Sequence, residues 1–223
     1  MPEISVLLTS IDSLPPVSPP HYKFYNERRF YAIDYAMKEM LQLLTHHSTP
    51  ARLMTEPAPD SAQLRQIFEI AMTAPDHGRL HPYRFLTIRG DARYALSQVF
   101  GEAVQQRDPV VSDEYLQKQK DKPLRAPLIV IVIASLIESR KIPAIEQMLC
   151  AGAAAHNILL ACNAMGFGSI WLTGDNAYDN HVKSALGLAG NEHIVGFLYI
   201  GTELKPPASS TKPNVEEKIS EWL

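Results

Sequence analysis

The longest apolar run in the chain, APLIVIVIAS at residues 126–135, limits the possible folds more than any other stretch. Every residue from Leu128 to Ala134 is apolar, and the five in the middle are β-branched. The run is much shorter than the roughly 20 residues that span a bilayer, and β-branched residues favour strands. We therefore expect a buried strand at 128–134 and no membrane span.

Patterns on either side of this run predict an α+β domain in which helices outnumber strands. Apolar residues recur at three- and four-residue spacing after Asp60, which predicts a capped helix at 61–73. A helix at 143–165 opens at Pro143, is rich in alanine and has few polar residues, which predicts burial on most sides or in a subunit contact. The other expected elements are helices at 26–45, 91–106, 113–120 and 177–186, strands at 84–89, 169–172 and 194–202, and a loop at 50–59.

The beginning of the chain differs in composition from the rest. The stretch SLPPVSPPHYK contains four prolines, which favour an extended, polyproline-like conformation. We expect an N-terminal arm at 1–25 and one domain at 26–223. No Lys or Arg precedes Lys23, and Glu3 and Asp12 interrupt the apolar residues, so neither a secretory nor an organelle signal fits. A cytoplasmic location is the default expectation.

The charge balance argues against a nucleic-acid partner. The formal net charge is -3, and no Lys/Arg cluster with interleaved aromatic residues is present. A nucleic-acid-binding protein needs such a basic surface to attract phosphates. With 46% hydrophobic and 20% charged residues, the chain has the composition of a soluble globular protein.

Two pairs of histidines raise the question of a metal or catalytic site. His46 and His47 are adjacent, and His77 and His81 have a spacing that would place both on one face of a helix. The prolines and the glycine of APDHGRLHPY disfavour a helix there, and no third ligand is suggested nearby. A metal is therefore not expected; the plain alternative is that these histidines face solvent or are hydrogen bonded in the core.

Motifs for nucleophilic catalysis and for phosphate loops are absent from the sequence. There is no G-x-S-x-G motif, and neither Cys150 nor Cys162 has a His or Asn partner nearby in the sequence. Neither G-x-G-x-x-G nor G-x-x-x-x-G-K-[ST] occurs, and the glycines of MGFGSIWLTGD lead into a strand rather than a helix. A Rossmann nucleotide site is therefore disfavoured.

Several segments together resemble the nitroreductase-like flavoprotein family, specifically its compact YdjA-type subgroup of NAD(P)H nitroreductases. They are STPARLMTEPAPDSAQL (48–64), APDHGRLHPYRFLTIRG (74–90), RAPLIVIVIA (125–134), IPAIEQMLCAGAAAHNILLACNAMGFGSIWLTG (142–174) and IVGFLYIGT (194–202). The resemblance implies an α+β nitroreductase-like fold: a central, mostly antiparallel sheet surrounded by helices. It also implies an intertwined homodimer with one FMN in each of two interfacial pockets, NAD(P)H as reductant and a small acceptor such as a nitroaromatic or quinone. The chemistry is then carried by FMN, so no catalytic residue of the protein is expected.

The resemblance also implies positions that contact FMN. The Arg-Arg-Ser that contacts phosphate in the family falls on His46, His47 and Ser48, so only the serine is kept. A flavin-contacting Arg of some members becomes Thr73, and the histidine that follows it is kept as His77. Trp-Arg-Ser becomes Trp171, Leu172 and Thr173. Each lost arginine removes a charge-assisted hydrogen bond worth about 1.5 to 3 kcal/mol.

Alternatives stay open for several of these positions. For His77 the alternative is a hydrogen bond to a backbone carbonyl that anchors the loop from Pro75 to Pro82, and for Trp171 it is packing in the core. Other cations, Arg52, Lys205 or Lys212, are candidates to replace the lost arginines. For the whole chain the alternative is a family member with weakened or lost FMN binding that serves as a flavin-binding or structural protein. The acceptor and the choice between NADH and NADPH also stay open.

Overall fold

The computed structural model describes residues 40–41, 47–205 and 213–222. The chain divides into two units, 1–44 and 45–223. In the first unit, Met40 and Leu41 are helical. The rest of the expected helix at 26–45, and the expected boundary between arm and domain at residue 25, lie outside the described residues.

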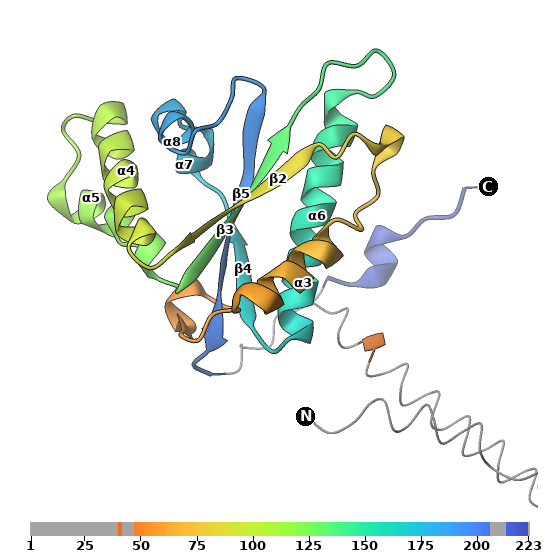
Figure 1. Ribbon diagram of the computed structural model, residues 1–223, viewed down its shortest axis with the longest axis horizontal. Coiled ribbons are helices and arrows are strands. Elements are labelled where there is room, and N and C mark those ends of the chain that lie inside the picture. Colours follow the sequence, from red (N-terminus) through yellow and green to blue (C-terminus); the bar gives the residue numbers. More distant parts are fainter. Residues whose placement is uncertain (1–39, 42–46, 206–212, 223) are drawn as a thin grey trace, which may run out of the picture. The chain divides into compact units, whose positions relative to one another are not determined.

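A five-stranded sheet forms the centre of the second unit (Figure 1). Its strands are β1 (Met54–Thr55), β2 (Tyr83–Arg89), β3 (Leu128–Ser135), β4 (Gly168–Leu172) and β5 (Glu192–Glu203). β5 pairs with β1, β3 and β4, while β3 also pairs with β2 and leaves β2 at an edge of the sheet. All of these described pairs are antiparallel, as expected.

The side chains of β3 alternate between two hydrophobic clusters, one on each face of the sheet. Leu128, Val130 and Val132 belong to the cluster formed with α3 (Ser61–Ala71) and α6 (Ala144–Ala164). Ile129, Ile131 and Ile133 belong to the cluster formed with α4 (Ala92–Arg107), α7 (Asp175–Tyr178) and α8 (Asn180–Ala185). Because helices cover both faces, the strand needs apolar residues at every position, which explains the uninterrupted run. The predicted α+β fold class is confirmed (Figure 1).

Side-chain caps fix where several helices begin. The Asp60 carboxylate accepts a hydrogen bond from the Gln63 backbone N–H, and the Gln63 side chain accepts one from the Asp60 N–H, a reciprocal capping box for α3. The Ser112 hydroxyl accepts from Tyr115 N–H at the start of α5 (Asp113–Lys120). The helices at 61–73 and 113–120 thus form close to their expected bounds.

The expected single helix at 177–186 is wrong, because the chain breaks at Asp179. Asp179 has extended backbone angles, and its carboxylate accepts from the N–H groups of His181 and Val182. A cap of this kind starts a new helix, so α7 ends at Tyr178 and α8 begins at Asn180. The expected loop at 50–59 also needs correction, since it contains a 3-10 turn, η1 (Ala51–Leu53), and β1. The other described 3-10 turns are η2 (His77–Arg79), η3 (Lys122–Leu124) and η4 (Val215–Lys218).

Helix α6 is one of the covering helices of the sheet and also has an outward apolar side. Ile145 and Leu149, one turn apart, are 63% and 65% exposed. Among the described residues α6 is the one helix long and apolar enough to cross a membrane by length and composition, which alone is weak evidence for a span. Half of that apolar stretch is buried inside the domain, as in the core helix of a soluble protein.

Candidate flavin site

The ends of β1, β4 and β5 bring residues 47–53 beside residues 203–205, a region we name the strand-end corner. Backbone bonds hold it: Thr49 N–H donates to the Ser169 carbonyl over 3.0 Å, and Leu204 N–H donates to the Leu53 carbonyl over 2.9 Å. In β1, Met54 pairs with Glu203. Of the three residues expected to contact the flavin phosphate, His47 and Ser48 lie here; His46 lies outside the described residues.

A carboxylate that the sequence did not point to lies in the strand-end corner. Glu203 Oε1 is 3.3 Å from His47 Nε2 and also accepts a hydrogen bond from the Thr49 hydroxyl. A Cβ on Gly168 would lie 2.5 Å from Glu203 Cγ, so the missing side chain at Gly168 makes room for the stem of Glu203. Glu203 therefore adds one negative charge beside the expected phosphate contact.

Two cations lie in the segments that form the same corner. Arg52 lies in η1, and Lys205 directly follows the segment that bonds to Leu53; both are exposed. Ser48 is exposed and adds a hydroxyl. A guanidinium, an ammonium, an imidazole and a hydroxyl are donor types that bind a phosphate, so this set fits FMN despite Glu203. Lys212, the third candidate cation, lies outside the described residues.

In the second group, Thr73 and His77 both lie beside α6, but at different heights: their partners Asn157 and Glu146 are about 16 Å apart along the helix axis. The Thr73 hydroxyl donates to the Ile70 carbonyl over 2.7 Å and lies 3.4 Å from the Asn157 amide nitrogen of α6. His77 Nδ1 is 2.6 Å from the Glu146 carboxylate in the first turn of α6. The alternative of a loop-anchoring His77 thus has a concrete partner, a side chain of α6 rather than a backbone carbonyl.

In the third group, residues 171 and 172 end β4, where successive side chains point to opposite faces of the sheet, and residue 173 follows the strand. Trp171 belongs to the hydrophobic cluster with α6, its Nε1–H donates to the Val195 carbonyl over 3.2 Å, and its ring covers Gly196. Leu172 packs on the opposite face of the sheet, in the cluster with α4. Thr173 is exposed. The packing of Trp171 agrees with the alternative of a core role, and its contact with flavin stays a prediction.

Helix α6 keeps the second and third groups apart. At about 100° per residue, Glu146 and Asn157, which contact His77 and Thr73, point within roughly 20° of each other. Gly152, whose Cβ would lie 3.8 Å from the Trp171 ring, points about 130° away from them. The expected contacts of one flavin therefore lie on two flanks of one helix.

His77 and His81 have separate carboxylate partners. His81 Nδ1 is 3.3 Å from the Asp76 carboxylate, whereas His77 contacts Glu146. In the part of the chain that the structure describes, no group of three or more His, Cys, Asp or Glu side chains could hold a metal ion. Cys150 lies near Asp76, and burial first and Asp76 second raise the pKa of its thiol, which keeps it neutral.

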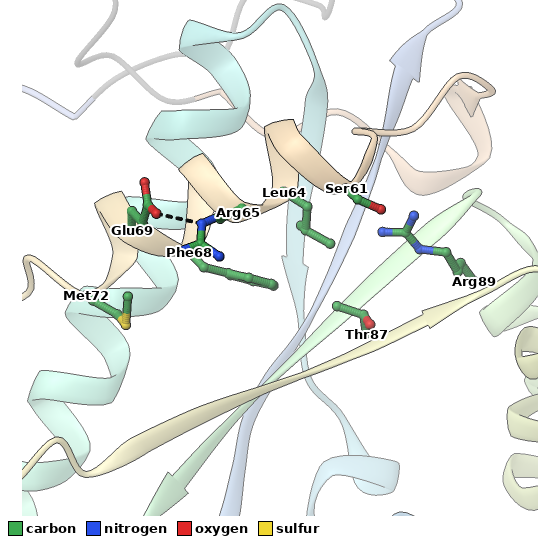
Figure 2. A pocket seen from close by; sticks show the side chains of 8 residues that line it. All are labelled: Ser61, Leu64, Arg65, Phe68, Glu69, Met72, Thr87 and Arg89. Carbon is green, nitrogen blue, oxygen red and sulfur yellow. Dashed lines mark hydrogen bonds and ion pairs between the residues drawn. The ribbon is translucent and has the colours of Figure 1, made fainter.

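A groove of about 700 Å³ lies between α3 and the edge strand β2 (Figure 2). Phe68, Leu64 and Met72 give it an apolar lining, with Arg65 and Arg89 among the polar residues around it. Arg65 is paired with Glu69 over 3.0 Å. None of the positions expected to contact FMN lines this groove.

The nitroreductase family model matches residues 44–202 of the chain. YdjA of Escherichia coli (strain K12), which bears a provisional name as an NAD(P)H nitroreductase, is 37% identical over 177 residues, or 79% of this chain and 95% of that protein. A provisionally named NAD(P)H nitroreductase of Haemophilus influenzae is 35% identical over 168 residues, covering 75% and 90%.

Solved structures share the fold. A nitroreductase-like family protein from Bacillus cereus superposes with a TM-score of 0.67 at 23% identity, covering 79% of this chain and 91% of that one. A provisionally named nitroreductase from Desulfovibrio desulfuricans in complex with FMN gives 0.62 at 22% identity, covering 82% and 96%. The predicted fold is confirmed, as are the oxidoreductase class and FMN as the cofactor that the family uses. The chain belongs to the nitroreductase family.

Proposed function

We propose that this chain is a homodimeric, FMN-dependent NAD(P)H oxidoreductase that reduces a small acceptor such as a nitroaromatic compound or a quinone. The observation that carries the proposal is the reach of the family match, 44–202, which includes every position expected to contact FMN from His46 to Thr173. The names of the relatives support NAD(P)H as reductant, and the FMN complex of the same fold supports the cofactor.

When bound, FMN supplies the redox chemistry between NAD(P)H and the acceptor, and the protein binds and orients it. In the strand-end corner, Arg52, Lys205 and Ser48 are the donors we assign to the phosphate. The Arg52 guanidinium and the Lys205 ammonium are charged at neutral pH, so both can bind the phosphate there. His47 adds a positive charge only when it is protonated, and the Glu203 carboxylate then competes with the phosphate for the imidazole.

The dimer explains why the expected contacts lie on two flanks of α6. In a single chain, Thr73 and His77 are on one flank and Trp171 is on the other. If each pocket combines one flank of each subunit, both sets serve the same flavin. The exposed Ile145 and Leu149 on the outward side of α6 supply apolar surface for the contact between subunits.

Steady-state kinetics test the proposal. FMN-loaded protein should oxidise NADH or NADPH much faster when menadione or a nitroaromatic is added. Double-reciprocal plots at several acceptor concentrations should be parallel, because reductant and acceptor react in separate half-reactions. Fully loaded protein that turns over neither nucleotide with either acceptor would contradict the reductase assignment.

One observation favours a second candidate, a family member with weakened FMN binding that serves as a flavin-binding or structural protein. Glu203 places a carboxylate beside His47, one of the two histidines at positions where the family pattern has arginines. Titration with FMN at about pH 6 and pH 8 separates the candidates. An affinity that is weak at both values favours the second one, and tight binding at both values excludes it.

A further inference from the structure

The loop from Asp76 to Pro82 is held in an unusual backbone conformation. Arg79 and His81 have φ values of 54° and 47°, a left-handed region that L residues with side chains rarely adopt. The Asp76 carboxylate stabilises this shape by accepting from the N–H groups of Leu80 (3.1 Å) and His81 (2.7 Å). Strain of this kind persists only where the surroundings fix it, and it concentrates at functional sites.

The same loop is packed against the start of α6. Gly78 has a φ of 75°, and a Cβ there would lie 2.4 Å from Cδ1 of Ile142, which is buried just before the helix. The loop and the first turn of α6 therefore form one packed unit. This unit sets the distance between the His77 ring and the Glu146 carboxylate.

The contact between His77 and Glu146 determines which ring nitrogen is available to a ligand. Glu146 Oε2 is 2.6 Å from His77 Nδ1, and an ionised carboxylate only accepts hydrogen bonds. Nδ1 therefore carries the hydrogen, and Nε2 is left for a ligand. In the neutral ring Nε2 is an acceptor, suited to an N–H or O–H donor such as the N3–H of the flavin ring or a ribityl hydroxyl.

The pair is too exposed to matter much for folding. The side chains of His77 and Glu146 are 62% and 42% exposed. Even a fully charged pair at such an exposed site contributes only about 0 to 1 kcal/mol to stability, so a purely structural role predicts almost no effect of removing Glu146. An orienting role predicts instead an effect on ligand binding, because a carboxylate behind an imidazole fixes its tautomer and direction.

We propose that Glu146 is a positioning residue for FMN: it holds His77 with Nδ1 protonated, so that Nε2 meets a hydrogen-bond donor of the flavin. The inference rests on the proposed function, since it requires that the chain binds FMN. Glu146 belongs to no motif in the sequence. The loop from Asp76 to Pro82 then serves to orient His77 toward the flavin.

The test compares FMN dissociation constants, measured by quenching of flavin fluorescence, for wild type, Glu146→Ala, His77→Ala and the double variant. Glu146→Ala should weaken FMN binding about 5- to 15-fold, because a His77 ring that is no longer oriented loses its hydrogen bond to the flavin. The double variant should bind no more weakly than His77→Ala, because Glu146 acts through His77. Glu146→Gln, which keeps an acceptor for Nδ1–H, should restore affinity to within about twofold of wild type.

The chain offers a matched control. His181 Nε2 is 2.8 Å from the Glu102 carboxylate, a similar exposed pair between α4 and α8. Glu102→Ala should leave FMN affinity and the flavin spectrum unchanged. Nitrogen NMR of the apoprotein gives a second readout, in which the His77 ring should lose its Nδ1-protonated signature in Glu146→Ala.

The outcomes separate the two proposals. Wild type that does not bind FMN contradicts the proposed function. Wild type that binds FMN while Glu146→Ala binds equally well overturns the role of Glu146 and leaves the proposed function standing. Fully additive losses in the double variant also overturn it, because Glu146 would then act independently of His77.

Discussion

At the scale of single residues, Glu192 in β5 shows how a partly buried carboxylate supports the fold. It accepts two hydrogen bonds from the Arg84 guanidinium, of 2.6 and 2.7 Å, one from the Ser135 hydroxyl and one from Ala189 N–H. These donors, Arg84 foremost, lower the pKa of Glu192 from 4.5 to about 2. A pKa that is lower in the folded state means that stability is gained above 4.5 and lost as the pH falls toward 2.

Glu192→Gln should therefore reduce the free energy of unfolding at pH 7 by about 1.5 to 3 kcal/mol, the value of charge-assisted hydrogen bonds. The difference from wild type should narrow as the pH falls from 4.5 toward 2. Urea denaturation across this range measures both effects. Glu69→Gln, which removes the exposed Arg65–Glu69 pair, is the control and should change stability by less than about 1 kcal/mol. A difference in unfolding free energy between wild type and Glu192→Gln that stays constant with pH would contradict the lowered pKa of Glu192.

Glu203 gives a second prediction, specific to the phosphate. Its carboxylate lies beside His47 and Thr49, where we place the flavin phosphate. Glu203→Gln removes a like charge and should tighten FMN binding about 3- to 10-fold, since one such repulsion in a partly screened site costs roughly 1 kcal/mol. Riboflavin has no phosphate, so its affinity should not change. If Glu203→Gln raised the affinities for FMN and riboflavin equally, Glu203 would not act on the phosphate.

At the scale of elements, the sequence predicts those parts that depend on local patterns. The strand expected at 128–134 forms as Leu128–Ser135, and α5 forms at 113–120, where Ser112 caps it. These elements carry their own signals: a continuous β-branched run, or a capping residue before a helical stretch. The break at Asp179 was missed because an aspartate inside a helical pattern is also tolerated on an exposed helix face.

The candidate site was predicted less completely, because it depends on contacts between distant segments. The strand-end corner forms because β1, two residues long, pairs with the end of β5, and so short a strand has no periodicity to detect. Glu203 and Glu146 were missed for the same reason. They become relevant only when β5 meets His47 and α6 meets His77.

Gly196 tests the packing between β5 and Trp171. A Cβ on Gly196 would lie 2.0 Å from the indole Nε1 and 2.5 Å from Cδ1, so Gly196→Ala must displace the indole. We expect a loss of about 1 to 3 kcal/mol of stability by thermal or urea unfolding, the usual cost of overpacking. Gly190→Ala is the matched control, because nothing lies within 4 Å of its added Cβ. Equal stabilities of the two variants would contradict the packing described for Trp171.

At the scale of the whole molecule, the account requires two copies of the chain. One chain presents Thr73 and His77 on one flank of α6 and Trp171 on the other, and the side chains of Ile145 and Leu149 on this helix are exposed. A protein that buried α6 in a dimer would cover these apolar side chains and complete the pockets in one step.

Leu149→Glu should shift the protein from dimer to monomer in analytical ultracentrifugation, because it places a charge in an apolar contact. It should also weaken FMN binding by at least about tenfold, since each pocket would lose one of its two flanks. Val110→Glu changes a side chain that is 91% exposed beyond the end of α4 and should alter neither property. Dimers that persist in Leu149→Glu with normal FMN affinity would rule out the outward side of α6 as the subunit contact.

Whether the protein holds FMN is measured by its visible absorbance spectrum before and after addition of FMN, followed by gel filtration to remove unbound flavin. We expect a flavin band at about 450 nm that remains with the protein at one FMN per chain, because the protein holds the cofactor that carries the chemistry. Protein that stays colourless after FMN addition, at both pH 6 and pH 8, would contradict it.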